Sequence, residues 1–196
     1  VGFINPDPDH AELMMTGGEF CGNATRSAAY HILQGQPGKI SIKVSGVKKK
    51  LQAGVTKEGE SFSQMPVYAD PAYVQSDPKH PGNYLVFLEG ITHYIDFDAK
   101  QIKGLSKDEI IRGAQKTMRA KNIDKQAACG IIYVEQLTNT WVIYPVVYVR
   151  DADTLYYETA CWSGTTALGL VLAQKTGTSI KEVPVNWRHV ETKNVT

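Results

Sequence analysis

Two cysteines, Cys21 and Cys161, stand in matching short motifs, one in each half of the chain. The first motif reads EFCGNAT from Glu19, and the second reads ETACWSGT from Glu158. In both, a threonine follows four positions after the cysteine and leads into an alanine-containing helical pattern. A cysteine at a helix start lies beside unpaired backbone N–H groups and the positive end of the helix dipole, which lowers its thiol pKa. The spacing therefore predicts two reactive thiols.

The same helix starts also predict a site for a carboxylate, because small residues there can direct backbone N–H groups at an anion. Inversion of an α-carbon needs a base on one face and an acid on the other, and a thiolate and a thiol would supply that pair. Amide donors at the carboxylate would stabilise the carbanion. This chemistry requires no metal and no other cofactor. The predicted carboxylate ligands are Gly22 and Asn23 in the first motif and Ser163 and Gly164 in the second.

Around the motifs, the residue pattern predicts an α+β chain. Helical patterns end at Gly35 and Gly177, and a third helix is capped by Ser106 with Glu109 three residues later. The third cysteine, Cys129, falls in a strand pattern and is expected to pack in the core. Helices are predicted over residues 23–34, 107–120 and 164–175, and strands over 13–16, 39–44, 50–55, 84–88, 92–97, 127–135 and 140–149, the last two joined by a turn at 136–139.

A proline-containing segment over residues 69–82 divides the chain into unequal halves. We place the domain boundary there, with residues 1–76 carrying Cys21 and residues 77–196 carrying Cys161. The chain opens on Val1 and runs directly into an apolar stretch, so we expect a fragment of a longer protein.

Composition narrows the possible partners. The 196 residues include 21 Lys and Arg and 20 Asp and Glu. The net charge of +1 creates no electrostatic field that would attract nucleic acid or an anionic membrane. No apolar run is long enough to span a bilayer, and no signal peptide is recognisable. We expect a cytoplasmic chain with a small amino acid as its partner, and the sequence leaves a homodimer open.

At its two cysteine motifs the chain resembles the diaminopimelate epimerase superfamily, whose members carry Cys-Gly-Asn in one domain and Cys-Gly-Ser in the other. The strings VGFI from Val1, GEFCGNAT from Gly18 and ETAC from Glu158 look closest to the histidine racemases of opine-metallophore biosynthesis. The resemblance spans nearly the whole chain. It implies two pseudo-symmetric domains, each a curled, mostly antiparallel sheet around a central helix, truncated at both ends. It also implies an amino-acid racemase or epimerase that needs no pyridoxal phosphate, with Cys21 and Cys161 as its acid/base pair in a cleft between the domains.

The resemblance extends to further positions, with departures. His93, in the string GITH, falls where the epimerases have a histidine that lines the cleft. Thr16 stands where they place a substrate-binding asparagine, and Trp162 replaces their small glycine, which would reshape the carboxylate site. The segment 150–154 lacks the Glu-Arg pair that holds the distal end of diaminopimelate, which argues against that substrate.

Several alternatives stay open. Glu158, like Glu19, is a ligand of the substrate amine, a residue that supports the ligands without touching the substrate, or a charge that caps a helix. The chain is alternatively a diaminopimelate epimerase with unusual distal contacts, or a relative that binds an amino acid without turning it over. One cysteine paired with His93 as an acyl-transfer nucleophile would leave the other cysteine unexplained.

If both cysteines face one substrate carbon, their sulfurs should form a disulfide when the empty protein is oxidised by diamide. Thiol titration after denaturation should then count one free thiol of the three cysteines in the chain. The Cys21→Ser variant should keep both of its remaining thiols. Three free thiols after oxidation would argue that the two sulfurs do not meet.

Overall fold

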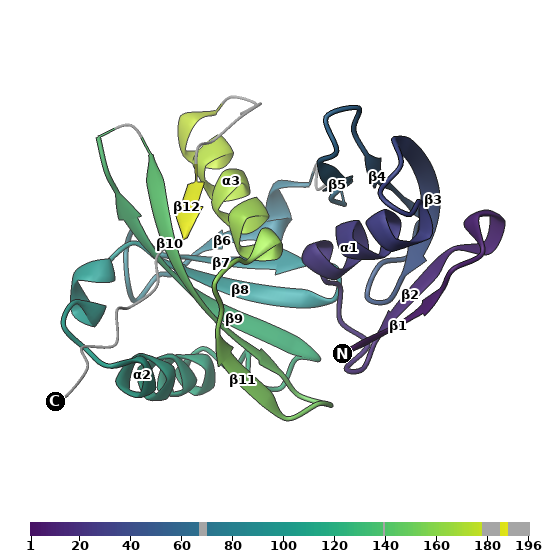
Figure 1. Cartoon of the computed structure of the whole chain (residues 1–196). Helices are drawn as coiled ribbons and strands as arrows, with labels where there is room; N and C mark the ends of the chain where they lie inside the picture. The colour runs from purple at the N-terminus through teal and green to yellow at the C-terminus, as the bar shows by residue number, and fades with distance from the viewer. Residues whose placement is uncertain (67–69, 139, 178–184, 188–196) are drawn as a thin grey trace, which may run out of the picture. The chain divides into compact units, whose positions relative to one another are not determined.

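The computed structural model describes residues 1–66, 70–138, 140–177 and 185–187 (Figure 1). The chain forms two compact units. Unit 1 comprises Val1–Val67 with Glu89–Ile91, and unit 2 comprises Tyr68–Leu88 with Thr92–Thr196. Both units combine helices with a sheet, which confirms the α+β prediction. The domain boundary drawn after residue 76 stays a prediction.

Unit 1 is a five-stranded sheet covered on one face by α1. Its strand order is β1-β2-β3-β4-β5, and every neighbouring pair is antiparallel except β2 and β3. Along β3, Ile40, Ile42 and Val44 are buried while the alternate residues are not, so one face of the sheet lies on the core. The buried residues pack with Ala28 and Ala29 of α1. The elements are β1 (Gly2–Asn5), β2 (Glu12–Met15), α1 (Gly22–Ile32), β3 (Gly38–Val44), β4 (Leu51–Val55) and β5 (Ser61–Ser63).

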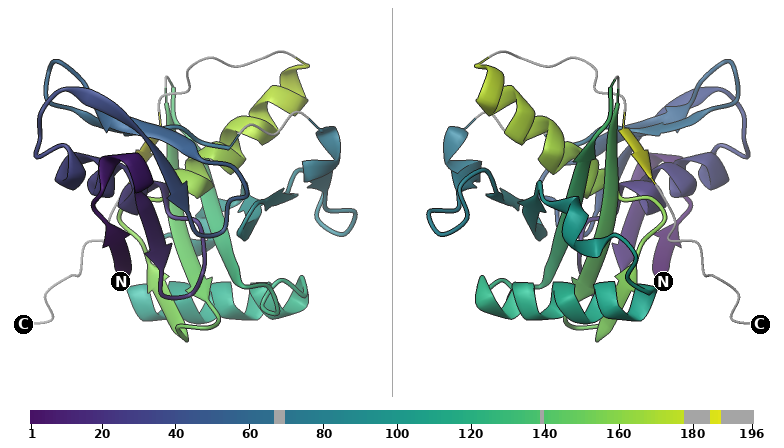
Figure 2. Two further views of the ribbon diagram at one scale, coloured as in Figure 1. Left: turned by 90° about the vertical axis from the view of Figure 1, so that its right-hand side faces the viewer. Right: turned by 90° about the vertical axis from the view of Figure 1, so that its left-hand side faces the viewer.

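Unit 2 is a seven-stranded mixed sheet with two helices. Its strand order is β11-β10-β9-β8-β7-β6, and β12 also pairs with β10. The two longest strands, β9 and β10, run side by side in both views of Figure 2. Parallel pairs join β8 to β9 and β10 to β12. The elements are β6 (Val74–Ser76), β7 (Tyr84–Leu88), β8 (Ile91–Asp96), α2 (Lys107–Ala120), β9 (Ala128–Gln136), β10 (Trp141–Val149), β11 (Thr154–Tyr157), α3 (Trp162–Thr176) and β12 (Val185–Trp187).

The two helices of unit 2 cover opposite faces of its sheet (Figure 1). Ile110 of α2 packs in one core cluster with Tyr94 of β8 and Ile131 of β9. Their neighbours along the two strands, His93 and Ile132, contact the first turn of α3 instead. Because successive side chains of a strand point to opposite faces, α2 and α3 must lie on different sides. The middle of this sheet is therefore buried on both faces, which explains why β8 is buried along its whole length.

Most predicted elements are confirmed, including all three helices and both long strands. Ser106 and Glu109 form the predicted capping box of α2, and Gly177 ends α3 with a φ of 65°. The predicted turn over residues 136–139 includes residue 139, which lies outside the described residues. The short strands β1, β5, β6 and β12 were not predicted.

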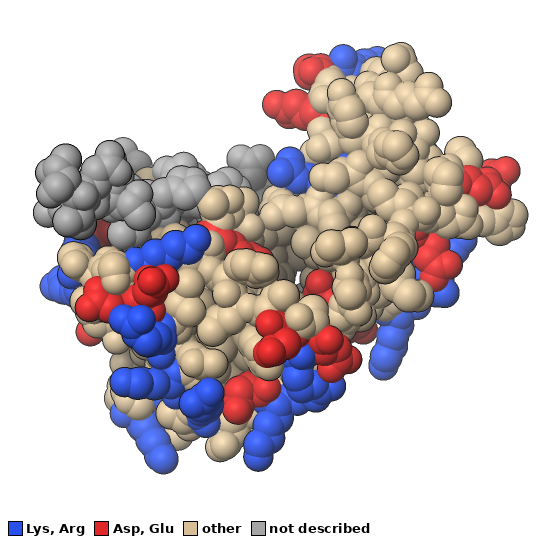
Figure 3. Space-filling model, turned by 60° about the horizontal axis from the view of Figure 1, so that its bottom comes forward, with Lys and Arg blue, Asp and Glu red and all other residues tan. Residues whose placement is uncertain are grey.

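No helix in the described part of the chain is long and apolar enough to cross a membrane. On the face shown in Figure 3, Lys and Arg side chains lie interspersed with Asp and Glu. This mixture agrees with the nearly balanced charge of the sequence.

A buried cluster of charged side chains connects the segment before β7 to β8 and to the end of α2. The Asp77 carboxylate, 6% exposed, accepts hydrogen bonds from Tyr94 Oη at 2.8 Å and from Lys121 Nζ at the end of α2. His80 Nδ1 lies 2.9 Å from the same carboxylate. Burial raises the pKa of Asp77, but the hydrogen bonds from Lys121 and Tyr94 outweigh burial and hold it well below its usual value. Asp77 therefore stays ionised and links three elements.

Replacement of Asp77 by Asn should lower the free energy of unfolding by about 3 kcal/mol, because it leaves the nearly buried Lys121 without its counter-ion. Urea unfolding followed by tryptophan fluorescence measures this, since all three tryptophans lie after residue 140. The matched control is Asp151→Asn, which removes an exposed ion pair with Arg150 and should change stability by at most about 0.5 kcal/mol. Equal losses in the two variants would contradict a special role for Asp77.

Candidate active site

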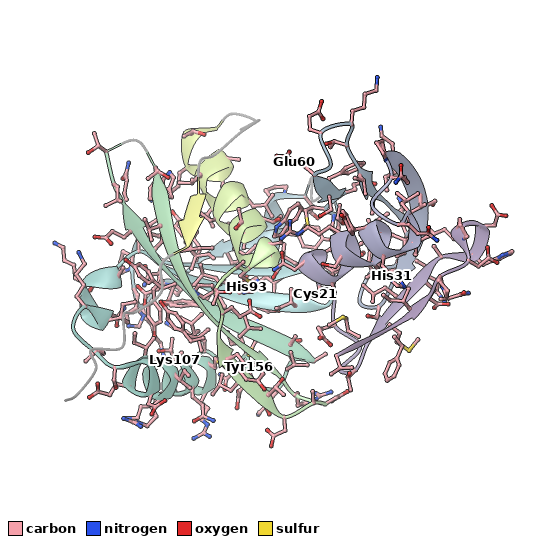
Figure 4. All side chains as sticks on the ribbon, in the orientation of Figure 1. Cys21, His31, Glu60, His93, Lys107 and Tyr156 are labelled. Carbon is pink, nitrogen blue, oxygen red and sulfur yellow. The ribbon has the colours of Figure 1, made fainter. Side chains whose placement is uncertain are left out.

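Cys21 is the N-cap of α1. Its backbone is extended, with φ −132° and ψ 104°, and its Sγ accepts a hydrogen bond from the Ala24 N–H at 3.5 Å. Thr25 donates to the Cys21 carbonyl twice, from its hydroxyl at 2.8 Å and from its N–H at 2.9 Å. The threonine of the sequence motif thus fixes the carbonyl of the cysteine while the sulfur caps the helix. Figure 4 shows Cys21 at this end of α1.

Cys161 caps α3 with the same geometry. Its φ and ψ are −134° and 101°, and its Sγ accepts from the Gly164 N–H at 3.4 Å. Thr165 repeats the double donation to the cysteine carbonyl, at 2.9 Å from both groups. The prediction that both cysteines lie at helix N-termini is confirmed. Sulfur is a weaker hydrogen-bond acceptor than the oxygens that usually cap helices, so capping alone does not explain why cysteine occurs twice.

In unit 2, Cys161 belongs to a chain of three polar side chains, which we call the His93–Ser163–Cys161 chain. His93 Nε2 lies 2.8 Å from Ser163 Oγ, and Ser163 Oγ lies 3.5 Å from Cys161 Sγ. All three residues are buried, and His93 is 0% exposed on β8. In Figure 4 His93 lies inside unit 2, beneath α3. A β-strand and a helix start, distant in sequence, therefore meet at this cysteine.

The imidazole of His93 is neutral. Burial lowers the pKa of His93 to about 3, and the Gly130 backbone beside the ring only partly opposes this shift. Gly130, in the middle of β9, leaves room for the ring, because a Cβ there would lie 2.5 Å from His93 Nδ1. Gly130 was not among the predicted site residues, although a glycine inside a strand of large apolar residues is a signal of close approach.

The helix start was expected to lower the pKa of the Cys161 thiol, and the structure contradicts this expectation. Burial raises the pKa of Cys161 well above its usual value, and the neighbouring Glu158 carboxylate raises it further. Hydrogen bonds from Ser163 and from the Gly164 N–H act in the opposite direction but are outweighed. The helix N-terminus is present as predicted, yet removal from water dominates. Cys161 is therefore a neutral thiol that could donate a proton.

The predicted carboxylate ligands occupy the first turns of the two helices. Gly22 is buried in α1, and Asn23 next to it is half-buried. The Gly164 N–H is used by Cys161 Sγ. A Cβ on Gly164 would lie 2.7 Å from Ile132 Cδ1 and 3.2 Å from Cys161 Sγ, so a glycine lets α3 begin this close to β9. The binding of a substrate carboxylate at these residues stays a prediction.

Three other predicted ligands lie in differing surroundings. Thr16 is exposed, and its hydroxyl donates to the Val1 carbonyl at 2.7 Å, where it closes the β1–β2 pair. Trp162 is half-buried as the first residue of α3, and Glu158 is half-buried beside the Cys161 thiol. Unit 2 thus brings together Cys161, Ser163, Gly164, His93 and Glu158, and unit 1 brings together Cys21, Gly22 and Asn23.

Comparison with known proteins finds a family model that describes the N-terminal domain of the histidine racemase CntK and matches residues 1–186. A histidine racemase of Fusobacterium nucleatum (strain ATCC 23726) is 32% identical over 180 residues, which cover 88% of this chain and 65% of the relative. The histidine racemase of Staphylococcus aureus (strain Mu50) is 25% identical over 185 residues, covering 87% of this chain and 63% of the relative. The chain thus spans less than two thirds of the length of these relatives. Among solved structures, a PhzC/PhzF protein of Clostridium difficile is 14% identical with a TM-score of 0.44, covering 90% of this chain and 66% of that one.

The neutral His93 predicts a pH dependence of stability. Its folded pKa of about 3 lies below the ordinary value of 6.5, so between these values the unfolded chain binds a proton that the folded chain does not. Stability should therefore be lost as the pH falls below 6.5, by up to about 1.4 kcal/mol per pH unit from this group. Urea unfolding followed by circular dichroism from pH 7.5 to 4.5 should show a smaller slope for His93→Gln than for the native protein.

The control for this experiment is His31→Gln, on the exposed face of α1. Its pH curve should keep the slope of the native protein. A His93→Gln curve that runs parallel to the native one would contradict a neutral, buried His93.

Proposed function

Because the chain belongs to the family of the histidine racemase CntK N-terminal domain, we propose that the protein is an amino-acid racemase that inverts the α-carbon of histidine, with Cys21 and Cys161 as its two acid/base groups. The proposed reaction needs neither pyridoxal phosphate nor a metal ion. One observation carries the proposal. Two helices begin with a cysteine cap of the same geometry, and each sulfur lies at the positive end of its helix.

The environments of the two thiols support a division of roles. Cys161 is buried and protonated, and Cys21 is half-buried. For one antipode Cys21 would remove the α-proton as thiolate while Cys161 returns a proton to the opposite face. For the other antipode the protonation states are exchanged. The enzyme must therefore also stabilise Cys161 as a thiolate.

In the His93–Ser163–Cys161 chain, Ser163 can form a hydrogen bond with Cys161 both as a thiol and as a thiolate. When Cys161 is protonated, its S–H can point at Ser163 Oγ while the serine hydroxyl donates to a bare Nε2 of His93. When Cys161 is a thiolate, the serine hydroxyl can donate to the sulfur, and the other tautomer of the imidazole can donate to the serine. The hydrogen bonds then run in the opposite direction, while His93 and Ser163 stay neutral in both states. A buried neutral histidine is well suited to this task, whereas a lysine or arginine would only donate.

The first turns of α1 and α3 support the binding of the substrate carboxylate. Backbone N–H groups at Gly22 and Ser163 belong to helix N-termini, where anions are stabilised. Electron density that develops on the carboxylate during proton removal would be stabilised by the same groups.

The test is exchange of the α-proton in deuterated buffer, followed by NMR with L-histidine, D-histidine and diaminopimelate as separate substrates. We expect exchange with both histidine antipodes and a loss of at least about 100-fold in Cys21→Ser and in Cys161→Ser, since each removes one member of the acid/base pair. The matched control is Cys129→Ala, in the core of β9, which should retain exchange.

Each other outcome has a clear meaning. Exchange that survives in both serine variants would overturn the cysteine pair. Exchange with diaminopimelate alone would assign the other substrate. A folded native protein that binds histidine without exchange would show a relative that binds the amino acid without turning it over.

A further inference from the structure

Glu19 carries a buried carboxylate oxygen that no group of the described chain satisfies. Its Oε2 is inaccessible to solvent and has no hydrogen-bond partner. No ion pair involves Glu19 among the described residues. A buried carboxylate oxygen without a donor costs free energy, so a folded protein normally pairs it with a donor or leaves it in water. Such an acceptor calls for a donor that the described chain does not supply, such as water, an ion or a ligand.

Other glutamates of the molecule do find donors. Glu12 lies 2.8 Å from Lys43 Nζ, and Glu135 lies 2.6 Å from Lys103 Nζ. In the described part of the chain, Glu19 is the one carboxylate with a buried, unsatisfied oxygen. The exception falls two residues before Cys21.

The backbone of Glu19 is fixed, so the position of its side chain is imposed by the fold. Its carbonyl accepts a hydrogen bond from Ser45 Oγ at 2.8 Å, and Ser45 Oγ in turn accepts from the Met15 N–H at 2.9 Å. Ser45 thereby joins the end of β2 to the loop that leads into α1.

Two glycines press against the same loop. A Cβ at Gly46 would lie 2.4 Å from the Phe20 nitrogen, and a Cβ at Gly90 would lie 3.1 Å from it. Both glycines have positive φ, 74° and 77°, which other residues rarely adopt. Together with Ser45, they leave the backbone of this loop little freedom to move.

We propose that Glu19 binds the positively charged N–H group of the substrate amino acid; this inference rests on the proposed function. The helix N-terminus at Cys21 attracts the carboxylate of an amino acid but repels its ammonium group, so the zwitterion needs an anion close by. Glu19 provides that anion at the loop before the cysteine. The same chemistry fits either the α-ammonium or a protonated imidazole of histidine, and the experiment separates the two.

The test is binding, measured by isothermal titration calorimetry with three probes: L-histidine, L-phenylalanine and imidazolepropionate, which lacks the α-ammonium group. In Glu19→Gln the Kd for L-histidine should rise by about tenfold or more, the size of a lost hydrogen bond to a charged group. The control Glu60→Gln, at an exposed site of unit 1, should leave every Kd unchanged. Equal Kd values in the native protein and Glu19→Gln would overturn the proposal.

The probes identify the group that is bound. If Glu19 holds the α-ammonium, the substitution should weaken phenylalanine as well as histidine and leave imidazolepropionate unchanged. If it holds the imidazole, imidazolepropionate should weaken and phenylalanine should not. If the native protein binds phenylalanine but not histidine, and Glu19→Gln weakens that binding, the proposed substrate fails while the role of Glu19 stands. If no probe binds to the native protein, both proposals fail.

The stability of Glu19→Gln distinguishes a residue that binds a ligand from one that stabilises the fold. Glu19→Gln removes the charge of a half-buried carboxylate whose Oε2 is buried without a donor, so the free energy of unfolding of the variant should equal or exceed that of the native protein. A carboxylate that served the fold would instead lower stability on replacement. A stabilised variant with weakened binding would be expected only of a ligand-binding residue.

Discussion

The hydrogen bond from a helix-start N–H to a cysteine sulfur is the constraint on which both halves of this molecule depend. It requires the cysteine to be extended and the next residues to turn into a helix, which both Cys21 and Cys161 do. The threonine four residues later then fixes the cysteine carbonyl from within the first turn. Each sulfur is therefore held by its own helix rather than by a loop. A reactive group placed in this way keeps its position without help from the substrate.

Equal backbone geometry does not give equal chemistry. The helix dipole acts on both sulfurs in the same direction, but its effect is worth at most a few kcal/mol near a surface and less than the cost of burying a charge. At Cys161 burial and the Glu158 carboxylate decide the outcome, and the thiol stays protonated. Ser163 and His93 then provide hydrogen bonds that serve either protonation state. One half-buried and one buried thiol would suit the proposed reaction, which must both remove and return a proton.

Local features were predictable from the sequence, and features that depend on packing were not. The helix starts, the Ser106 cap and the Gly177 end are set by residues within one turn of each other, so their pattern could be read directly. The strands that were missed are three or four residues long, and pairing with neighbours defines them more than residue preference does. The protonated state of Cys161 could not be predicted, because it depends on strands that arrive from elsewhere in the chain. The close fit of His93 over Gly130 has the same origin, since it joins two strands that are distant in sequence.

Buried polar atoms without a hydrogen-bond partner are unevenly distributed between the two cysteine motifs and the rest of the described chain. Among the described residues away from the two motifs, the side-chain polar atoms that the fold buries are matched, as Asp77 is by Tyr94 and Lys121. Close to the motifs the molecule tolerates a cost, in the carboxylate of Glu19 and in Nδ1 of His93. Natural proteins retain such costs where function needs them and remove them elsewhere. The fold tolerates such atoms beside each capped cysteine, with Glu19 on the loop before α1 in unit 1 and His93 on β8 in unit 2. Buried polar atoms that a fold leaves without a partner are found in proteins at functional sites more than in the scaffold.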